Sequence, residues 1–130
     1  MLAVMRTPTI DDMKYGIRLS LYRKPPIPRW VLRQIHEAEV APYRPAQITL
    51  IKDLMANEAR FATKRFDWRM PVFLIWGERD RLIPNSVAEA VMRRNRLPAD
   101  HLYIVPRTGH VANLERPRSF ERTLRDVLAR

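Results

Sequence analysis

Residues 71–80 read PVFLIWGERD, in which large apolar side chains follow one another without a break until a glycine and a charged loop. A short apolar run that ends at a turn residue is typical of a strand buried on both faces of a parallel sheet. Residues 101–105, HLYIV, form a second short run of the same kind. The two runs predict two strands separated by a segment long enough for a helical crossover.

Two helices are expected in the same half of the chain. Asn85 and Ser86 are suited to cap a helix that ends near Asn95, because short polar side chains accept the free amides of a first turn. Pro117 suits the first turn of a last helix. The inward-facing residues of that helix are predicted from their spacing to be Phe120, Leu124 and Val127 or Leu128. Strand, helix, strand, helix predicts an α/β unit with a parallel sheet.

The first half of the chain is predicted to be helical and interrupted by prolines. Thr9 and Asp12 have the spacing of a capping box at the start of a helix that ends before Pro25. A second helix is expected over residues 29–40 and a third after Pro45. The apolar residues that we expect to line their faces are Ile10, Met13, Ile17, Leu21, Val31, Ile35, Ala38, Ile48, Ile51, Leu54 and Met55. These faces predict a small helical layer.

Polar segments follow both predicted strands. The first is residues 77–84, GERDRLIP, and the second is residues 109–117, GHVANLERP. Ligands of open α/β sheets bind at the carboxyl ends of the strands. The candidate functional residues are therefore expected in these two loops.

The two loops together resemble the C-terminal signature of the α/β-hydrolases. The matching residues are Pro71, Val72, Ile75, Trp76, Gly77, Asp80, Ile83 and Pro84, followed by Gly109, His110, Glu115, Pro117 and Phe120. The resemblance implies a partial α/β-hydrolase fold, with the last two parallel strands and their helices in residues 70–130. Residues 1–69 resemble more loosely the helical cap of that family. It also implies that Asp80 is the acid and His110 the histidine of a catalytic triad, since the family order is nucleophile, acid, histidine.

The chemistry of such a pair is proton transfer. A serine hydroxyl is a poor nucleophile until an imidazole accepts its proton, and a carboxylate fixes the imidazole tautomer. His110 would be the general base and then the general acid, and Asp80 would orient it. Glu78 stays open as an alternative acid. Gly109 would let its loop pass close to the site, and Glu115 would support the His110 loop or cap the last helix.

The nucleophile is missing from the sequence. A nucleophile elbow has the pattern Gly-x-Ser-x-Gly or its aspartate equivalent, and none of Gly16, Gly77 and Gly109 lies in such a pattern. We therefore expect a C-terminal fragment, a truncated reading frame, or a chain completed by a partner that supplies the N-terminal half. Because it lacks a nucleophile, the isolated chain is expected to be inactive. Because a two-stranded sheet has unpaired edges, the chain is also expected to be prone to aggregate.

The charge and composition of the chain argue against several classes of binding site and partner. The formal net charge is +10, but the 24 basic residues are dispersed and form only short doublets, which indicates a solvated surface and no nucleic-acid site. Without cysteine there is no disulfide or thiolate ligand, and His36, His101 and His110 lack metal-site spacing. We expect no cofactor and no metal. No signal peptide or membrane span is evident, which predicts a cytoplasmic protein with no membrane partner.

Two functions are favoured by these residues over a third, a basic nucleic-acid-binding protein whose binding would weaken steeply with salt. The first is cofactor-free hydrolysis of an ester or related bond in a small molecule, with the bond type and the choice of Ser or Asp nucleophile undecided. The alternative is a non-catalytic remnant that acts as a protein-interaction module, which predicts a stable homo-oligomer. Four aromatic side chains either line a pocket under the cap or belong to the core, the second being favoured: Tyr15, Trp30, Phe66 and Trp68.

Overall fold

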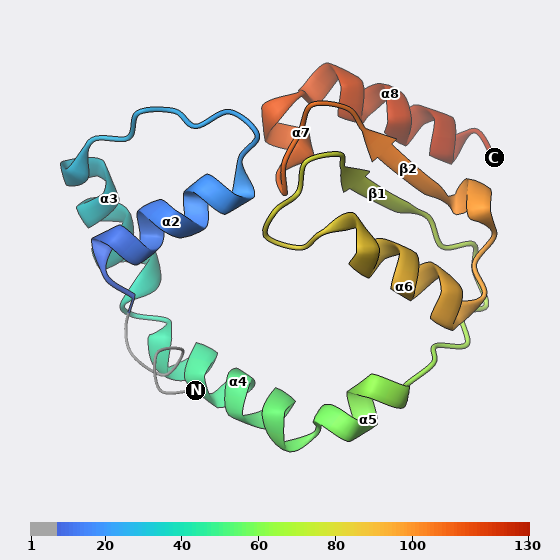
Figure 1. Ribbon diagram of the computed structural model, residues 1–130, viewed down its shortest axis with the longest axis horizontal. Helices are drawn as coiled ribbons and strands as arrows, with labels where there is room; N and C mark the ends of the chain where they lie inside the picture. The colour runs from blue at the N-terminus through green and yellow to red at the C-terminus, as the bar shows by residue number, and fades with distance from the viewer. Residues whose placement is uncertain (1–7) are drawn as a thin grey trace. The chain divides into compact units, whose positions relative to one another are not determined.

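The computed structural model of the chain describes residues 8–130, and its backbone divides into two compact units (Figure 1). One unit comprises the chain up to Tyr15 together with Pro25–Lys64, and the other comprises Gly16–Lys24 together with Arg65–Arg130. Helix α2 (Ile10–Ser20) contributes to both. Among the residues described, no helix is both long and apolar enough to cross a membrane.

The start of α2 confirms the predicted capping box. The Asp12 amide donates to Thr9 Oγ1 at 3.2 Å, and the Thr9 amide donates to Asp12 Oδ2 at 2.7 Å. Each side chain thereby satisfies the other residue's backbone N–H, which the first turn of a helix leaves without an intrahelical acceptor. The sequence therefore fixes where this helix begins.

The other elements of the first unit are also helical. They are α3 (Arg29–Ile35), the π-helical segment η1 (His36–Val40), α4 (Arg44–Ala56) and α5 (Glu58–Thr63). The helix expected over residues 29–40 is present, although its second part is π-helical, and α5 was not predicted. Leu32 is the fully buried residue of α3, whereas Ile35, which was expected to face inward, is 39% exposed. The predicted inward-facing side of α3 is therefore wrong, since it is displaced by part of a helical turn from the buried side.

The second unit contains the two strands and the helices that follow them. Strand β1 (Leu74–Gly77) pairs in parallel with β2 (Leu102–Val105), with Leu74 opposite Leu102 and Gly77 opposite Val105. The helical elements of this unit are α6 (Asn85–Asn95), the 3-10 turn η2 (Ala99–His101), α7 (Ala112–Glu115) and α8 (Pro117–Leu128). The observed order confirms the mixed α/β unit, within a chain that is mostly helical.

Helix α6 has the predicted length but a different start. Pro84 occupies the N-cap position without a side-chain hydrogen bond, and Asn85 is already the first helical residue. The expected cap by Asn85 and Ser86 is therefore wrong. Over residues 8–130 the buried Asn85 Oδ1 accepts no hydrogen bond, while Asn85 Nδ2 lies 3.4 Å from the Glu78 carbonyl oxygen. Arg96, at φ 55°, ends the helix in the left-handed region, and the Leu97 amide donates to the Met92 carbonyl at 3.0 Å.

The core of this unit lies where the helices contact the strands, α6 against β1 and α8 against β2 (Figure 1). Its buried apolar residues are Ala88, Met92, Val105 and Ala112. The apolar residues 74–76 of β1 are only half-buried, and Ile104 of β2 is 42% exposed. The expectation of a strand buried on both faces is thus not met within residues 8–130, because two strands flanked by two helices leave part of the sheet uncovered.

The four aromatic residues expected in the core are exposed. Tyr15 and Trp30 are 66% and 64% exposed, and Phe66 and Trp68 are 48% and 36% exposed. Phe66 and Trp68 stack on each other with their ring centroids 5.2 Å apart. The core interpretation of these residues is therefore wrong for this chain.

Candidate active site

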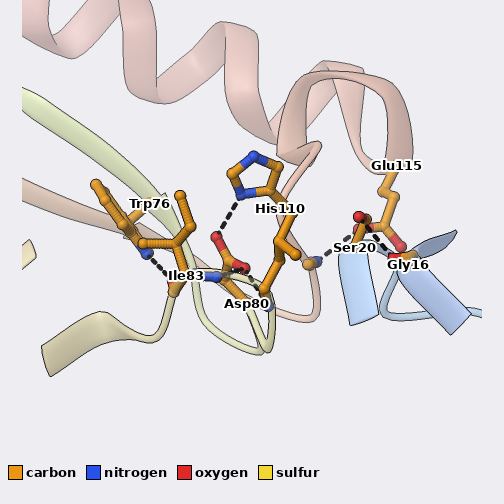
Figure 2. A network of polar contacts seen from close by, with 9 residues as sticks. Gly16, Ser20, Trp76, Asp80, Ile83, His110 and Glu115 are labelled. Atoms are coloured by element: carbon orange, nitrogen blue, oxygen red, sulfur yellow. Dashed lines mark hydrogen bonds and ion pairs between the residues drawn. The ribbon is translucent and has the colours of Figure 1, made fainter. Parts of the chain in front are cut away.

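The two polar loops meet at the carboxyl ends of β1 and β2. His110 Nδ1 lies 2.8 Å from Asp80 Oδ2, and the two side chains face each other in Figure 2. The Asp80 side chain is 3% exposed and the His110 side chain 36% exposed. A buried carboxylate therefore contacts an imidazole that remains open to solvent on its other side.

Asp80 is held by its own loop. Its Oδ1 atom accepts hydrogen bonds from the Leu82 amide at 3.0 Å and the Ile83 amide at 2.9 Å. Trp76 Nε1 donates to the Ile83 carbonyl at 2.9 Å, which ties the end of this loop to β1 (Figure 2). Backbone amides thus satisfy one carboxylate oxygen and leave the other to His110, as a buried carboxylate requires.

Glu78, the alternative acid, lies elsewhere. Its Oε2 atom accepts the Arg107 amide at 2.8 Å and lies 3.9 Å from Arg79 Nε. It braces the turn that follows β2, where Arg107 adopts φ 55°. Of the two acids in the loop, Asp80 is the one in contact with His110.

The His110 loop is held by a segment that the sequence reasoning did not connect with it. The His110 amide donates to the Ser20 carbonyl at 2.6 Å. Glu115 Oε2 accepts the Gly109 amide at 2.5 Å, while its Oε1 accepts the Tyr22 amide at 2.7 Å and the Arg23 amide at 3.2 Å. Residues 16–24 contribute backbone groups to these hydrogen bonds, so no side-chain pattern in this segment predicts them.

The role expected for Glu115 is partly confirmed. Its carboxylate supports the His110 loop through Gly109. It does not cap the last helix, because the N-cap of α8 is Arg116 and has no side-chain hydrogen bond.

Two glycines allow the loops to approach each other this closely. A Cβ atom on Gly77 would lie 1.9 Å from the Gly109 carbonyl oxygen, and one on Gly109 would lie 2.3 Å from the Ser20 carbonyl oxygen. Contacts this short with backbone leave no room for a side chain. The prediction that Gly109 lets the loop pass without a side chain is confirmed, and Gly77 has the same role.

A cavity of about 190 Å³ adjoins the pair. It is lined by Asp80 and His110 and by apolar side chains that include Trp76 and Phe120. Because Nδ1 of His110 faces the carboxylate, the tautomer that donates to Asp80 leaves Nε2 as a proton acceptor. The arrangement can accept and return a proton beside a mostly apolar recess.

The other histidines bond to backbone carbonyls. His36 Nε2 lies 2.9 Å from the Pro8 carbonyl oxygen, and His101 Nδ1 lies 2.8 Å from that of Val72. Over the described range, 8–130, no three His, Cys, Asp or Glu side chains converge in a way that would hold a metal ion.

Replacement of Glu115 by Gln should destabilise the second unit. An amide side chain has one acceptor oxygen, so either the Gly109 amide or the Tyr22 and Arg23 amides would face an NH₂ group. We expect the free energy of unfolding to fall by about 1–3 kcal/mol in urea titrations. Glu121→Gln is the control, since the ion pair between Glu121 and Arg125 lies at the exposed surface and its loss should change stability by less than about 0.5 kcal/mol. Equal effects of the two substitutions would contradict the role given to Glu115.

Comparisons with known proteins find hydrolases. No protein-family model matches the chain. The chain is 25% identical over 131 residues to a 2-hydroxy-6-oxononadienedioate/2-hydroxy-6-oxononatrienedioate hydrolase of Burkholderia vietnamiensis, with 98% of the chain and 44% of that protein aligned. The crystal structure of a membrane phospholipase A, a bacterial virulence factor, has a TM-score of 0.64 and 23% identity over 95% of the chain and 39% of that structure.

These matches agree with a partial α/β fold. The chain spans less than half the length of both proteins. At this identity the structural match shows the fold alone.

Proposed function

We propose that this chain is the C-terminal part of an α/β-type hydrolase and contributes the histidine and the acid of its catalytic triad. The observation that carries the proposal is the 2.8 Å contact between His110 and a buried Asp80 whose second oxygen is held by two backbone amides. Both distant relatives are hydrolases, which supports the same class. We further propose that residues 1–69 correspond to the cap segment and residues 70–130 to the core.

His110 would carry the proton in this reaction. With a serine nucleophile, Nε2 takes the hydroxyl proton as the oxygen bonds to the carbonyl carbon, and returns it to the leaving group when the ester C–O bond breaks. Water then attacks the acyl carbon while Nε2 takes one of its protons, and His110 gives that proton to the serine oxygen when the bond between the acyl carbon and serine breaks. With an aspartate nucleophile, His110 would activate only the water. Asp80 holds the imidazole and stabilises its cation in either case.

The nucleophile and the donors for the developing oxyanion would come from outside these 130 residues, from the rest of the protein or from a partner. The substrate would be a small molecule with an ester or related bond, because the cavity beside His110 is modest and mostly apolar. No cofactor enters this scheme.

Complementation tests the proposal. The chain is co-expressed with the N-terminal half of a related hydrolase that carries a nucleophile elbow, and the purified pair is assayed with an activated aryl ester. We expect hydrolysis that His110→Ala lowers by about 10³-fold or more. His36→Ala is the matched control and should retain activity, since His36 Nε2 contacts the Pro8 carbonyl oxygen. Hydrolysis that survives His110→Ala would overturn the role of His110.

A second candidate function is a protein-interaction module. Over residues 8–130 the sheet has two strands, β1 and β2, so each strand has an edge without a strand partner. Such edges template pairing with another chain. This alternative predicts a stable oligomer in analytical ultracentrifugation and no hydrolysis with any complementing half.

A further inference from the structure

The second unit has a recess that is separate from the cavity at His110. It has a volume of about 490 Å³ and lies between the segment after α2 and the start of α8. Its lining is strongly basic. The arginines in it are Arg23, Arg107, Arg116, Arg118 and Arg122.

Among residues 8–130, the lining of this recess holds five arginines against a single acid. Glu115 is the one acid among the lining residues, and its two oxygens already accept three backbone amides. Within residues 8–130, none of the five guanidinium groups forms an ion pair with a carboxylate. Elsewhere on the same unit arginines do pair, as Arg93 does with Glu89 and Arg125 with Glu121.

Unpaired like charges around one recess repel each other, and a bound anion would relieve that repulsion. We propose that this recess binds a ligand through a phosphate group. Guanidinium groups present planar pairs of donors that match phosphate oxygens. A cluster of several guanidinium groups matches the double negative charge of a phosphate better than the single negative charge of a carboxylate. Arg118 and Ser119 both line the recess and lie in the first turn of α8, where backbone amides lack intrahelical acceptors.

The shape of the site favours a single phosphate group over a polymer. The arginines come from three separate parts of the chain, 23, 107 and 116–122, and converge on one bounded recess. A site for extended nucleic acid would instead present its cations along a stripe or groove. The ligand is therefore a phosphate ester, or a lipid whose headgroup carries the phosphate.

Titration with inorganic phosphate tests the proposal directly. In ¹H–¹⁵N spectra of the full chain at low ionic strength, phosphate should shift the amides of Arg118 and Ser119, and the saturation curve gives the affinity. In Arg118→Gln/Arg122→Gln we expect the affinity to fall by about tenfold or more. Added sodium chloride should weaken binding by screening.

A double variant on α6, Arg93→Gln/Arg94→Gln, removes the same formal charge from another face and is the matched control. An equal loss of affinity in this control would overturn the proposal, since binding would then reflect net charge alone. The proposal would also be overturned if the Arg118 and Ser119 amide signals of the wild-type chain shifted neither with inorganic phosphate nor with vesicles that contain phosphatidic acid. This result does not depend on the folding of any variant.

Vesicles of phosphatidylcholine with and without phosphatidic acid identify the source of the phosphate. Binding to inorganic phosphate, lost in the double arginine variant, supports a soluble phosphate ester. Binding only to the vesicles that contain phosphatidic acid, again lost in that variant, supports a lipid headgroup. The proposal would be contradicted if the chain bound neither inorganic phosphate nor the vesicles that contain phosphatidic acid, but bound a DNA duplex equally tightly as wild type and as the Arg118→Gln/Arg122→Gln variant.

Discussion

Gly77→Ala is expected to lower the free energy of unfolding of the chain by about 3 kcal/mol or more. The new methyl group would lie 1.9 Å from the Gly109 carbonyl oxygen and 3.0 Å from that of Thr108. Both obstacles are backbone, so relief requires the end of β1 or the His110 loop to move. Gly77 is paired with Val105 in the sheet, and Glu115 holds the Gly109 amide. Neither segment can shift without losing hydrogen bonds. Urea titration followed by circular dichroism measures the loss.

Gly16→Ala is the matched control for this substitution. Gly16 lies within α2, and over residues 8–130 a Cβ atom there would meet no heavy atom within 4 Å apart from its chain neighbours and the backbone of its own helix. Alanine favours helix over glycine by about 1 kcal/mol, so this variant should be as stable as the wild type or more so. If both alanine variants unfold at the same urea concentration as the wild type, the close approach of the two loops in solution is disproved.

Asp80→Asn is expected to lower kcat/KM of the complemented hydrolase by about 10³- to 10⁴-fold. This expectation rests on the proposed function. Asp80 Oδ1 accepts the Leu82 and Ile83 amides, so an asparagine would keep its oxygen there and turn its NH₂ group toward His110. Nδ1 of His110 would then become the acceptor and Nε2 would carry the proton. The imidazole would remain in place but could no longer accept a proton from the nucleophile.

Glu78→Gln provides the comparison, because Glu78 is the other acid after β1 and contacts Arg107 and not His110. A glutamine oxygen can still accept the Arg107 amide, so kcat/KM should change by less than about threefold. Steady-state assays of the two variants in the same complemented complex decide between the acids. A large loss with Glu78→Gln and little loss with Asp80→Asn would reverse the assignment.

Local sequence was sufficient for much of the second unit. Unbroken apolar runs before Gly77 and around residues 102–105 identified both strands, since few other elements need so many consecutive apolar residues. The capping box at Thr9 also has a signature that depends on neighbouring residues alone. Asp80 and His110 were identified through the resemblance to the α/β-hydrolase signature, and their side chains lie 2.8 Å apart at one end of the sheet.

Other features depend on partners that no local pattern reveals. Asn85 has the chemistry of a cap, but its side chain amide turns to the Glu78 carbonyl and Pro84 takes the cap position. Trp30 and Tyr15 lie at helical spacing that is common for core residues, yet both side chains are exposed. The His110 amide donates to the Ser20 carbonyl. Every residue has a backbone carbonyl, so no sequence pattern predicts this contact.

The hydrogen bonds between Glu115 and the residues after α2 have a consequence for the order of folding. Tyr22 and Glu115 are 93 positions apart, and Arg81, which donates to the Arg18 carbonyl, is 63 positions from it. Closing a chain loop becomes entropically less favourable as it lengthens, by about 0.6 kcal/mol for each doubling. The strand pair, formed by segments nearer in sequence, should therefore assemble first, and the His110 loop should be completed after the rate-limiting step. Substitutions at Glu115 would then speed unfolding and leave the refolding rate almost unchanged.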